Sequence, residues 1–384
     1  MSAHDQWSID DVDDVLDGLR ASLERPFEEA LSLPPRAYTS GGFHRREVDS
    51  IFRHEWHCVG REDELDAPGK FVTLEIADEP VFAIRDKDRI RAFANICRHR
   101  LARLVEGRGQ AGRLVCPYHA WTYGTDGQLL SVPYKRDGFD PATCRLPELP
   151  VEIWRGWVYV TLNRSAEPLA PRLKALDDEM ANFRMEDYRT LFVTDEIWDT
   201  NWKCLVENFA EAYHVFAAHP KTVEPALPTR LNRYEPGADG WFRFVQDRVE
   251  GVGYEYDETP PILNDRLSED QCRAIPVFGV YPAHLLSLSP DRIFWLALQP
   301  RGVARVRVRW GLAVYPGAVP DGERDEQIPR LKTAFDAINA EDRGIVESVY
   351  RNAGSELAAS GRLQSLELCL WEFNRYIARM TCGA

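Results

Sequence analysis

The sequence predicts an α+β fold with two domains, and three observations support this class. Short β-type runs separated by turns fill residues 71–132, which indicates a small antiparallel β domain. Beyond residue 190, strand-like stretches and long helical patterns suggest an antiparallel sheet that grips a helix. The length of 384 residues, with 44% hydrophobic and 28% charged residues, fits about two globular domains.

The elements divide the chain into three segments. Residues 1–45 carry a helical pattern that ends in a stretch rich in Pro and Gly, so we expect a helical arm packing on the second domain. Residues 46–163 contain the β runs FVTLEI, PVFAIR, IRAFANI, QLLSVP and WVYVTLN. Residues 164–384 contain strands at LFVTDEIW, HLLSLSP, RIFWLALQP and VARVRVRWGLAVYP, and helices at 201–218, 326–351 and 362–380.

Charge and hydropathy exclude several classes of function. The 47 basic and 61 acidic residues give a net charge of −14, so we expect neither nucleic acid nor an anionic membrane as a partner. No apolar run approaches the roughly 20 residues of a membrane span, and the acidic start is unlike a secretory leader. We therefore expect a cytoplasmic protein.

Two of the eight cysteines stand next to histidines in a repeated pattern: Cys97-Arg-His99 and Cys116-Pro-Tyr-His119. Two thiolates and two imidazoles can hold one Zn²⁺ or a [2Fe–2S] cluster. Zinc sites usually pair like residues on each loop, whereas here each loop supplies one of each, which favours the cluster. We expect the other six cysteines to pack in the core or to lie at the surface: Cys58, Cys144, Cys204, Cys272, Cys369 and Cys382.

Residues 107–112 spell GxGxxG, the fingerprint of dinucleotide-binding folds. The fingerprint needs a following helix, but the next residues read as a strand and a metal loop. We interpret the segment as a turn and expect that this chain does not itself bind NAD(P)H.

A second set of metal-ligand residues lies in the helical pattern that starts at Asn201. Glu211 and His214 are three residues apart and share a helix face. His214 and His219 are about 140° apart on an ideal helix, so they converge only if the helix unwinds there. Two histidines and a carboxylate form the facial triad of mononuclear Fe(II) oxygenases; two core histidines with surface acids are the alternative.

Asp342 is the candidate for the third ligand. It falls near the centre of an apolar stripe in the helix 326–351, formed by Phe335, Ile338, Ile345, Val346 and Val349. A carboxylate on that face needs a metal or a strong partner. Glu341 lies about 90° away and is not selected by this criterion.

These motifs resemble the terminal oxygenase (alpha) subunits of the Rieske non-heme iron oxygenases: C-x-H-x16-C-x2-H, then NWK-x3-EN-x2-E-x-YH-x4-H. The resemblance implies an antiparallel-β Rieske [2Fe–2S] domain over 46–163 and a helix-grip catalytic domain with mononuclear Fe(II) over 164–384. The implied cluster ligands are Cys97, His99, Cys116 and His119, and the implied iron ligands are His214, His219 and Asp342. Leu101 departs from the family, which commonly has glycine there.

The resemblance also implies a role for Glu211 and a set of partners. The acidic residue at this position links a cluster histidine of one subunit, here His119, to an iron histidine of the next, here His214, in a homotrimer. O₂ is the co-substrate, and electrons from NAD(P)H arrive through a separate flavin or iron–sulfur reductase.

The overall pattern is similar to the branch that oxidises choline, glycine betaine, carnitine and proline betaine. That implies N-methyl oxidation of a quaternary or methylated amine, held by aromatic side chains. Candidate walls are Phe209, Phe216, Phe278, Tyr281, Trp295 and Trp371. The alternatives are hydroxylation, dihydroxylation or O-demethylation of an aromatic acid, held by His284 or the arginines of 301–309, and an iron–sulfur or zinc carrier without catalysis.

Overall fold

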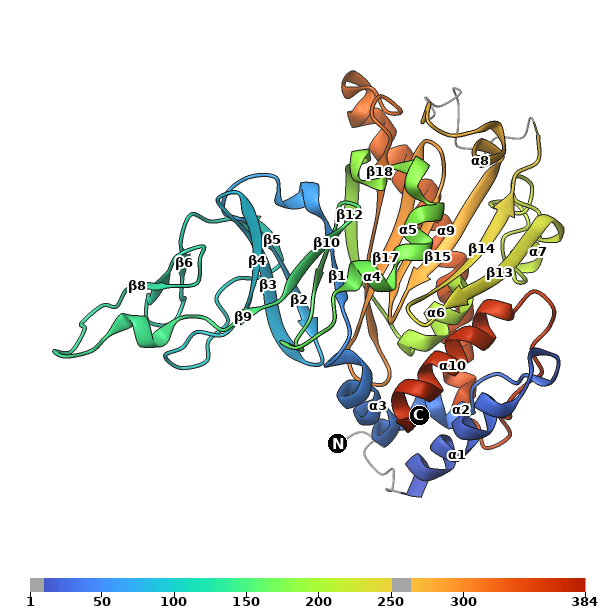
Figure 1. Cartoon of the computed structure of the whole chain (residues 1–384), viewed down its shortest axis with the longest axis horizontal. Helices are drawn as coiled ribbons and strands as arrows, with labels where there is room; N and C mark the ends of the chain where they lie inside the picture. The colour runs from blue at the N-terminus through green and yellow to red at the C-terminus, as the bar shows by residue number, and fades with distance from the viewer. Residues whose placement is uncertain (1–9, 251–263, 384) are drawn as a thin grey trace. The chain divides into compact units, whose positions relative to one another are not determined.

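The structure is a computed structural model that describes residues 10–250 and 264–383. The chain divides into two compact units (Figure 1). The small unit is Phe52–Ala170, and the large unit joins the described part of Met1–Ile51 to that of Pro171–Ala384. The N-terminal segment therefore belongs to the same unit as the C-terminal half, and the small unit is inserted between them.

The small unit consists of three antiparallel sheets. The central sheet has the order β5-β2-β3-β4-β9, with bounds Arg108–Gln110, Lys70–Ile76, Glu79–Asp86, Arg89–Ala94 and Glu148–Leu149. A second sheet has the order β1-β11-β10, with bounds His57–Arg61, Trp157–Val160 and Val151–Trp154. The third has the order β6-β7-β8, with bounds Leu114–Val115, Thr122–Tyr123 and Leu129–Ser131. The segment 107–112 forms β5 and its flanking residues rather than the start of a helix.

The large unit is built on one seven-stranded antiparallel sheet, in the order β12-β18-β17-β16-β15-β14-β13. The bounds in that order are Arg189–Trp198, Val306–Val314, Arg292–Pro300, His284–Leu288, Ala274–Val280, Trp241–Asp247 and Asn232–Ala238. The long helix α9 (Arg324–Ala353) lies against the sheet, where the rings of Phe335 and Phe294 of β17 are 5.0 Å apart. The predicted α+β class, with a sheet gripping a helix, is confirmed.

Helix α9 differs from its prediction in the face that it buries. Its buried residues are Leu331, Phe335, Asn339 and Val346. Ile345 and Val349, which the predicted stripe included, are 38% and 46% exposed, so that part of the prediction was wrong. Asp342 lies between Phe335 and Val346 at helical spacing, so its side chain still faces inward.

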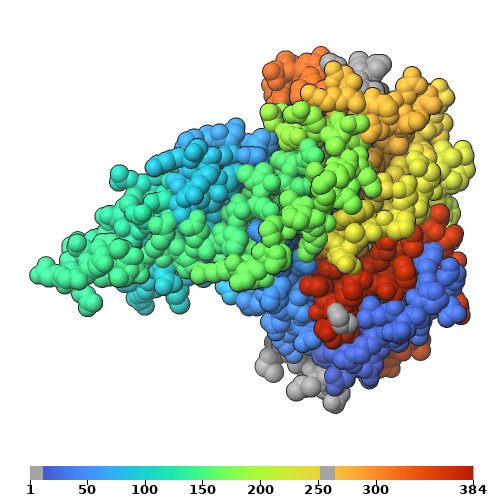
Figure 2. Space-filling model, viewed as in Figure 1, coloured from blue at the N-terminus to red at the C-terminus, as the bar shows by residue number. Residues whose placement is uncertain are grey.

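The N-terminal arm packs within the large unit. It comprises α1 (Asp10–Glu24), α2 (Pro35–Thr39) and α3 (Gly41–Glu47), and α1 contacts the C-terminal helix α10 (Leu368–Cys382). The arm and α10, coloured blue and red, lie side by side in Figures 1 and 2. Among the described residues, no helix combines the length and apolar character that crossing a membrane would require.

Buried polar contacts attach this arm to α6 (Trp202–Phe209), the helix that leads to the predicted iron ligands. Lys203 Nζ lies 2.6 Å from Glu47 Oε1, and both side chains are fully buried. Tyr38 Oη donates to Glu207, at 2.8 and 2.9 Å from its two carboxylate oxygens. Burial raises the pKa of Glu207 to about 7, although the Tyr38 hydrogen bond and the charge of Lys203 oppose the rise.

We expect the substitution Lys203→Met to lower the free energy of unfolding by about 3–5 kcal/mol, because it leaves the Glu47 carboxylate buried without its cation. The double variant Lys203→Met/Glu47→Leu should recover most of this loss. Equilibrium urea unfolding measures both. The control is Lys174→Met, since the Lys174–Asp178 pair is 70% and 61% exposed and is worth at most about 1 kcal/mol. Equal stability of the Lys203→Met and Lys174→Met variants would show that the buried pair does not stabilise the unit.

Candidate metal centres

The two Cys/His loops of the small unit have the same backbone hydrogen bonds. In the first, Cys97 N–H donates to Ala102 O (2.8 Å) and Leu101 N–H donates to Cys97 O (3.1 Å). In the second, Cys116 N–H donates to Trp121 O (2.8 Å) and Ala120 N–H donates to Cys116 O (3.0 Å). The residue after the common turn is left-handed in both loops, with φ of 60° at Leu101 and 54° at Ala120. Leu101 thus occupies a conformation that favours glycine.

The side chains on these loops suit a metal cluster. Cys97 and Cys116 are 1% and 2% exposed within one apolar core, and the rings of His99 and His119 are 4.6 Å apart. His119 Nδ1 is buried without a hydrogen-bond partner among the described residues. A metal bound at that nitrogen would satisfy it, so the donor set fits a [2Fe–2S] cluster with two thiolates and two imidazoles.

Neighbouring side chains orient the cluster loops. The His99 ring stacks on Trp121 at 4.7 Å with an interplanar angle of 6°. Tyr123 Oη accepts the backbone N–H of Arg98 (3.0 Å) and lies 3.4 Å from Cys97 Sγ. A tyrosine hydroxyl at that distance can donate to a thiolate, and hydrogen bonds to ligand sulfur tune a cluster's reduction potential.

In the large unit, the helical segment that carries the predicted iron-binding histidines is broken just ahead of them. Sequence periodicity predicts a continuous helix over 201–218, and that prediction was wrong: α6 ends at Phe209, and α7 is Val215–Ala218. Tyr234 of β13 accepts the N–H of Ala212 at 2.8 Å and holds the intervening turn. His214 and His219 flank the short helix α7, and His219 departs from helical geometry at its end, with φ of −117° and ψ of 44°.

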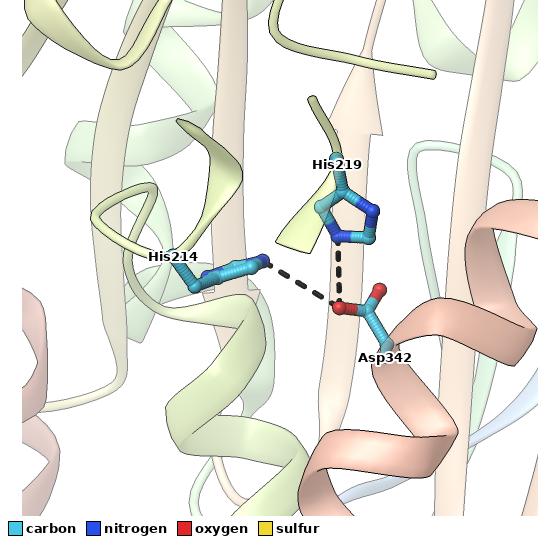
Figure 3. A group of neighbouring side chains, drawn as sticks. All are labelled: His214, His219 and Asp342. Carbon is cyan, nitrogen blue, oxygen red and sulfur yellow. Dashed lines mark hydrogen bonds and ion pairs between the residues drawn. The ribbon is translucent and has the colours of Figure 1, made fainter. Parts of the chain in front are cut away.

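His214, His219 and Asp342 point toward one another (Figure 3). Asp342 Oδ1 lies 2.9 Å from His219 Nε2 and 3.5 Å from His214 Nε2. One ligand atom from each residue lies within 4.8 Å of the other two. Two imidazoles and a carboxylate arranged in this way can bind a divalent metal and leave coordination positions open.

A second layer of polar side chains holds these three residues. Glu211 Oε1 lies 2.6 Å from His214 Nδ1, and Glu341 Oε2 lies 2.7 Å from His219 Nδ1. Asn208 Nδ2 donates to Asp342 Oδ1 at 3.2 Å. Each histidine therefore presents Nε2 to Asp342 and Nδ1 to a carboxylate, the arrangement that fixes the tautomer of a metal-binding histidine.

Sequence reasoning missed Glu341. Helical periodicity placed it about 90° from the inner face, but His219 approaches from another segment and meets it there. Thr222 Oγ1 also donates to Glu341, at 2.7 Å. The available signal was that a metal-binding histidine usually donates its other ring nitrogen to a carboxylate, and Glu341 stands next to Asp342 in the sequence.

The electrostatics of this site favour a cation. Burial lowers the pKa of His219, but hydrogen bonds and charges from Asp342 and Glu341 outweigh it and raise the pKa to about 9. In the absence of metal, a proton on His219 is the cation that these carboxylates stabilise. A divalent ion bound by deprotonated ligands would replace that proton.

A cavity adjoins the three ligands and is walled by the sheet, α6, α7 and α9. The described residues that line it are half apolar and half polar, with phenylalanines at 209, 244, 294 and 335, and its polar wall residues include Gln246, Ser287, Ser289 and Arg292. Of the six aromatic residues predicted as walls, Phe209 lines the cavity, whereas Phe216, Phe278, Tyr281, Trp295 and Trp371 are not among its described lining residues. The same holds for His284, which is buried beside Trp295.

The structure thus forms two separate groups from the predicted residues. Cys97, His99, Cys116 and His119 come together in the small unit. Glu211, His214, His219 and Asp342 come together in the large unit. All eight cysteines are free of disulfide bonds.

Comparison with known proteins identifies both units. The Rieske [2Fe-2S] domain family matches residues 55–150, and the catalytic domain of the ring hydroxylating alpha subunit family matches residues 178–383. The glycine betaine monooxygenase oxygenase subunit of Chromohalobacter salexigens is 35% identical over 222 residues, covering 56% of this chain and 50% of that protein. The chain spans about half the length of the glycine betaine relatives it matches. The carnitine monooxygenase oxygenase subunit of Escherichia coli K12 is 25% identical and covers 92% of this chain and 94% of that protein.

Solved structures share the fold. A quaternary ammonium Rieske monooxygenase described for carnitine oxidation superposes with a TM-score of 0.81 at 22% identity, covering 95% of this chain and 98% of that one. A naphthalene 1,2-dioxygenase from Rhodococcus gives a TM-score of 0.75 at 19% identity, covering 97% and 98%.

The catalytic-domain match covers more than half of the chain, and the residues that the fold brings together are those expected for a Rieske cluster and a mononuclear iron. The chain therefore belongs to the ring hydroxylating alpha subunit family and carries a Rieske [2Fe–2S] domain ahead of that family's catalytic domain.

Proposed function

We propose that this chain is the terminal oxygenase component of a Rieske-type monooxygenase that oxidises an N-methyl group of a quaternary or methylated amine. The observation that carries the proposal is the convergence of His214, His219 and Asp342 beside a cavity, in a chain that also holds the Cys/His cluster set. Relatives named for glycine betaine, carnitine and choline support the substrate class.

Each group of residues has a distinct task in this proposal. His214, His219 and Asp342 would hold Fe(II), and Cys97, His99, Cys116 and His119 would hold the Rieske cluster. When bound, these groups supply O₂ activation and single-electron transfer. Glu211 and Glu341 keep the two iron-site histidines in one tautomer, while phenylalanines exclude water from the cavity.

The overall reaction balances with outside electrons. A methylammonium group, O₂, two electrons and two protons give the N-hydroxymethyl product and water. That product then loses a proton and collapses to formaldehyde and the demethylated amine. Because NAD(P)H has no proposed site in this chain, a separate flavin or iron–sulfur reductase supplies the electrons.

The proposal includes a homotrimer in which Glu211 links His214 to His119 of a neighbouring copy. Glu211 already contacts His214, and apolar side chains are exposed near both proposed ends of this link. On the small unit, Leu101 is 79% and Tyr118 53% exposed; on the large unit, Tyr213 is 41% and Phe216 53% exposed. Two different apolar surfaces on one chain fit a head-to-tail ring, which buries both.

We expect wild-type enzyme, supplied with a surrogate reductase, to release formaldehyde from methylated amines and not from aromatic acids. Formaldehyde and O₂ consumption are measured for choline, glycine betaine, γ-butyrobetaine and a methoxybenzoate. Formaldehyde from the methoxybenzoate alone would instead favour the aromatic-acid alternative.

Iron and labile sulfide analysis separates catalysis from a carrier role, since zinc without sulfide would contradict the oxygenase proposal.

We expect Asp342→Ala to keep the visible spectrum of the cluster but to lose the mononuclear iron and turnover. Removing one of three ligands should weaken iron binding by at least about 100-fold, because loss of a supporting contact alone costs about 10- to 100-fold. Iron per chain and the cluster absorbance are measured together. The control is Asp336→Ala on the same helix, a 42% exposed acid paired with Lys332. Wild-type iron content in the Asp342→Ala variant would contradict the ligand assignment.

We expect Glu211→Gln to retain the cluster and, with iron supplied in excess, the mononuclear site. The neutral amide should slow electron transfer from reduced cluster to iron at least 100-fold, because it no longer accepts from both histidines as a carboxylate does. Single-turnover oxidation of the pre-reduced cluster is measured with substrate and O₂. Glu235→Gln, at a 45% exposed carboxylate, is the control. A wild-type rate in Glu211→Gln would exclude the bridge.

A further inference from the structure

The sheet forms one wall of the cavity, and this wall has a mainly polar row and a mainly apolar row of residues. Directly opposed residues in neighbouring strands share a face, and the register pairs Phe244 with Val277, Val277 with Ser287, and Ser287 with Phe294. Two residues further toward one end of these strands stand Gln246, Ile275, Ser289 and Arg292, and all of these except Ile275 are among the described residues that line the cavity. The polar row therefore lies at one end of the sheet face, beside the apolar row.

Arg292 provides a positive charge in this row. Its side chain is 8% exposed, and Asp291, 3% exposed, orients the guanidinium through Nε and Nη2 at 2.5 Å. The other ionisable side chains among the described lining residues are Glu211, His214, His219 and Asp342, which form the metal end. A buried ion pair is a poor source of stability compared with apolar residues of equal volume. A guanidinium in this wall is a group that can donate to an anionic part of a substrate.

The polar row and the metal site lie at opposite ends of the cavity. Phe335 of α9 contacts Phe294, next to Arg292 along the same face of β17. From Phe335, α9 runs two turns, about 10 Å, to Asp342. It continues until Val346 O accepts from Thr200, just beyond the end of β12. The end of β12 and Pro300 of β17 pair with the same residue of β18, so they lie at the same edge of the sheet. Pro300 is at the opposite end of β17 from Arg292.

We propose that Gln246, Ser289 and Arg292 form a carboxylate subsite that selects substrates carrying an acid group at the end remote from the oxidised methyl. The inference rests on the proposed function, because it places the N-methyl group at the metal end. The planar guanidinium, held by Asp291, donates to the carboxylate, and the Ser289 hydroxyl and Gln246 amide supply further donors. The apolar row packs against the chain between the two charged groups. The substrate class is thus a zwitterionic N-methylated amino carboxylate rather than an amino alcohol.

Two probes of equal length test the subsite: γ-butyrobetaine and 4-(trimethylammonio)butan-1-ol, which differ in the carboxylate alone. Their dissociation constants are measured calorimetrically on anaerobic holoenzyme, where no turnover occurs. Wild type should bind the acid at least about 10-fold more tightly than the alcohol, the effect of one charge-assisted hydrogen bond. Equal affinity for the two probes would overturn the proposal.

Three variants locate the effect. Asp291→Asn/Arg292→Gln removes both charges of the pair and should abolish the preference for the acid while leaving the affinity for the alcohol within about threefold. Gln246→Glu keeps Arg292 in place and should weaken binding of the acid specifically, because a second negative charge faces the carboxylate.

The control Arg233→Gln should behave as wild type, since Arg233 is paired with Val245 and so points away from the cavity face. An undiminished preference for the acid in both cavity variants would overturn the subsite even if one of them folded poorly.

A second pair of probes separates this inference from the proposed function. Benzoate and benzyl alcohol carry the same change of polar group on an aromatic body without an N-methyl. A preference that depends on Arg292 and appears only in the aromatic pair would uphold the carboxylate subsite and reject methylated amines as substrates. Absence of the preference in both pairs would reject the subsite and leave formaldehyde release as the test of the function.

Discussion

The large unit depends on one constraint: three side chains from two distant parts of the chain must meet at a single carboxylate oxygen. His214 and His219 approach Asp342 Oδ1 from the segment after α6, and Asn208 of α6 also donates to it. The chain stops being helical after Phe209, ahead of both histidines, and His219 departs from helical geometry at the end of α7. The sheet matters here because β13 supplies Tyr234, which holds the resulting turn.

The surroundings of the site are organised around this meeting point in layers. Carboxylates at Glu211 and Glu341 contact the outer nitrogens of the two histidines. Behind α6, the buried contacts of Lys203 and Glu207 with the N-terminal arm fix the rotation of that helix about its axis. In front, the sheet and α9 enclose a cavity whose lining changes from apolar to polar along the strands. The same helix thus links the arm, the proposed metal ligands and the cavity.

Local patterns predicted what depends on short stretches of sequence. The alternation of Cys and His on two loops predicted their convergence, and the loops prove to share one hydrogen-bond pattern. Strand β17 lies where its sequence placed it, and helical spacing selected Asp342. The strands β13, β14 and β15 were not predicted individually, because their pairing is decided by neighbours far along the chain.

The remaining errors have the same origin in long-range structure. Three features depend on what packs against each element, which periodicity cannot specify. They are the exposure of Ile345 and Val349, the role of Glu341, and the identity of the aromatic residues that line the cavity. The helix break is another case, since the hydrogen bond from Ala212 to Tyr234 joins residues on different elements.

The insertion of the small unit within the large one has a consequence for how the chain is made. Synthesis proceeds from the N-terminus, so the strands of the small unit are complete, and able to pair, before the main sheet of the large unit exists. Glu47 must remain hydrated until Lys203, 156 residues later, leaves the ribosome, and α1 has no α10 to cover it until the last residues are made. The arm that contacts α6 is thus synthesised before the elements that cover it and is among the last parts to reach its native environment.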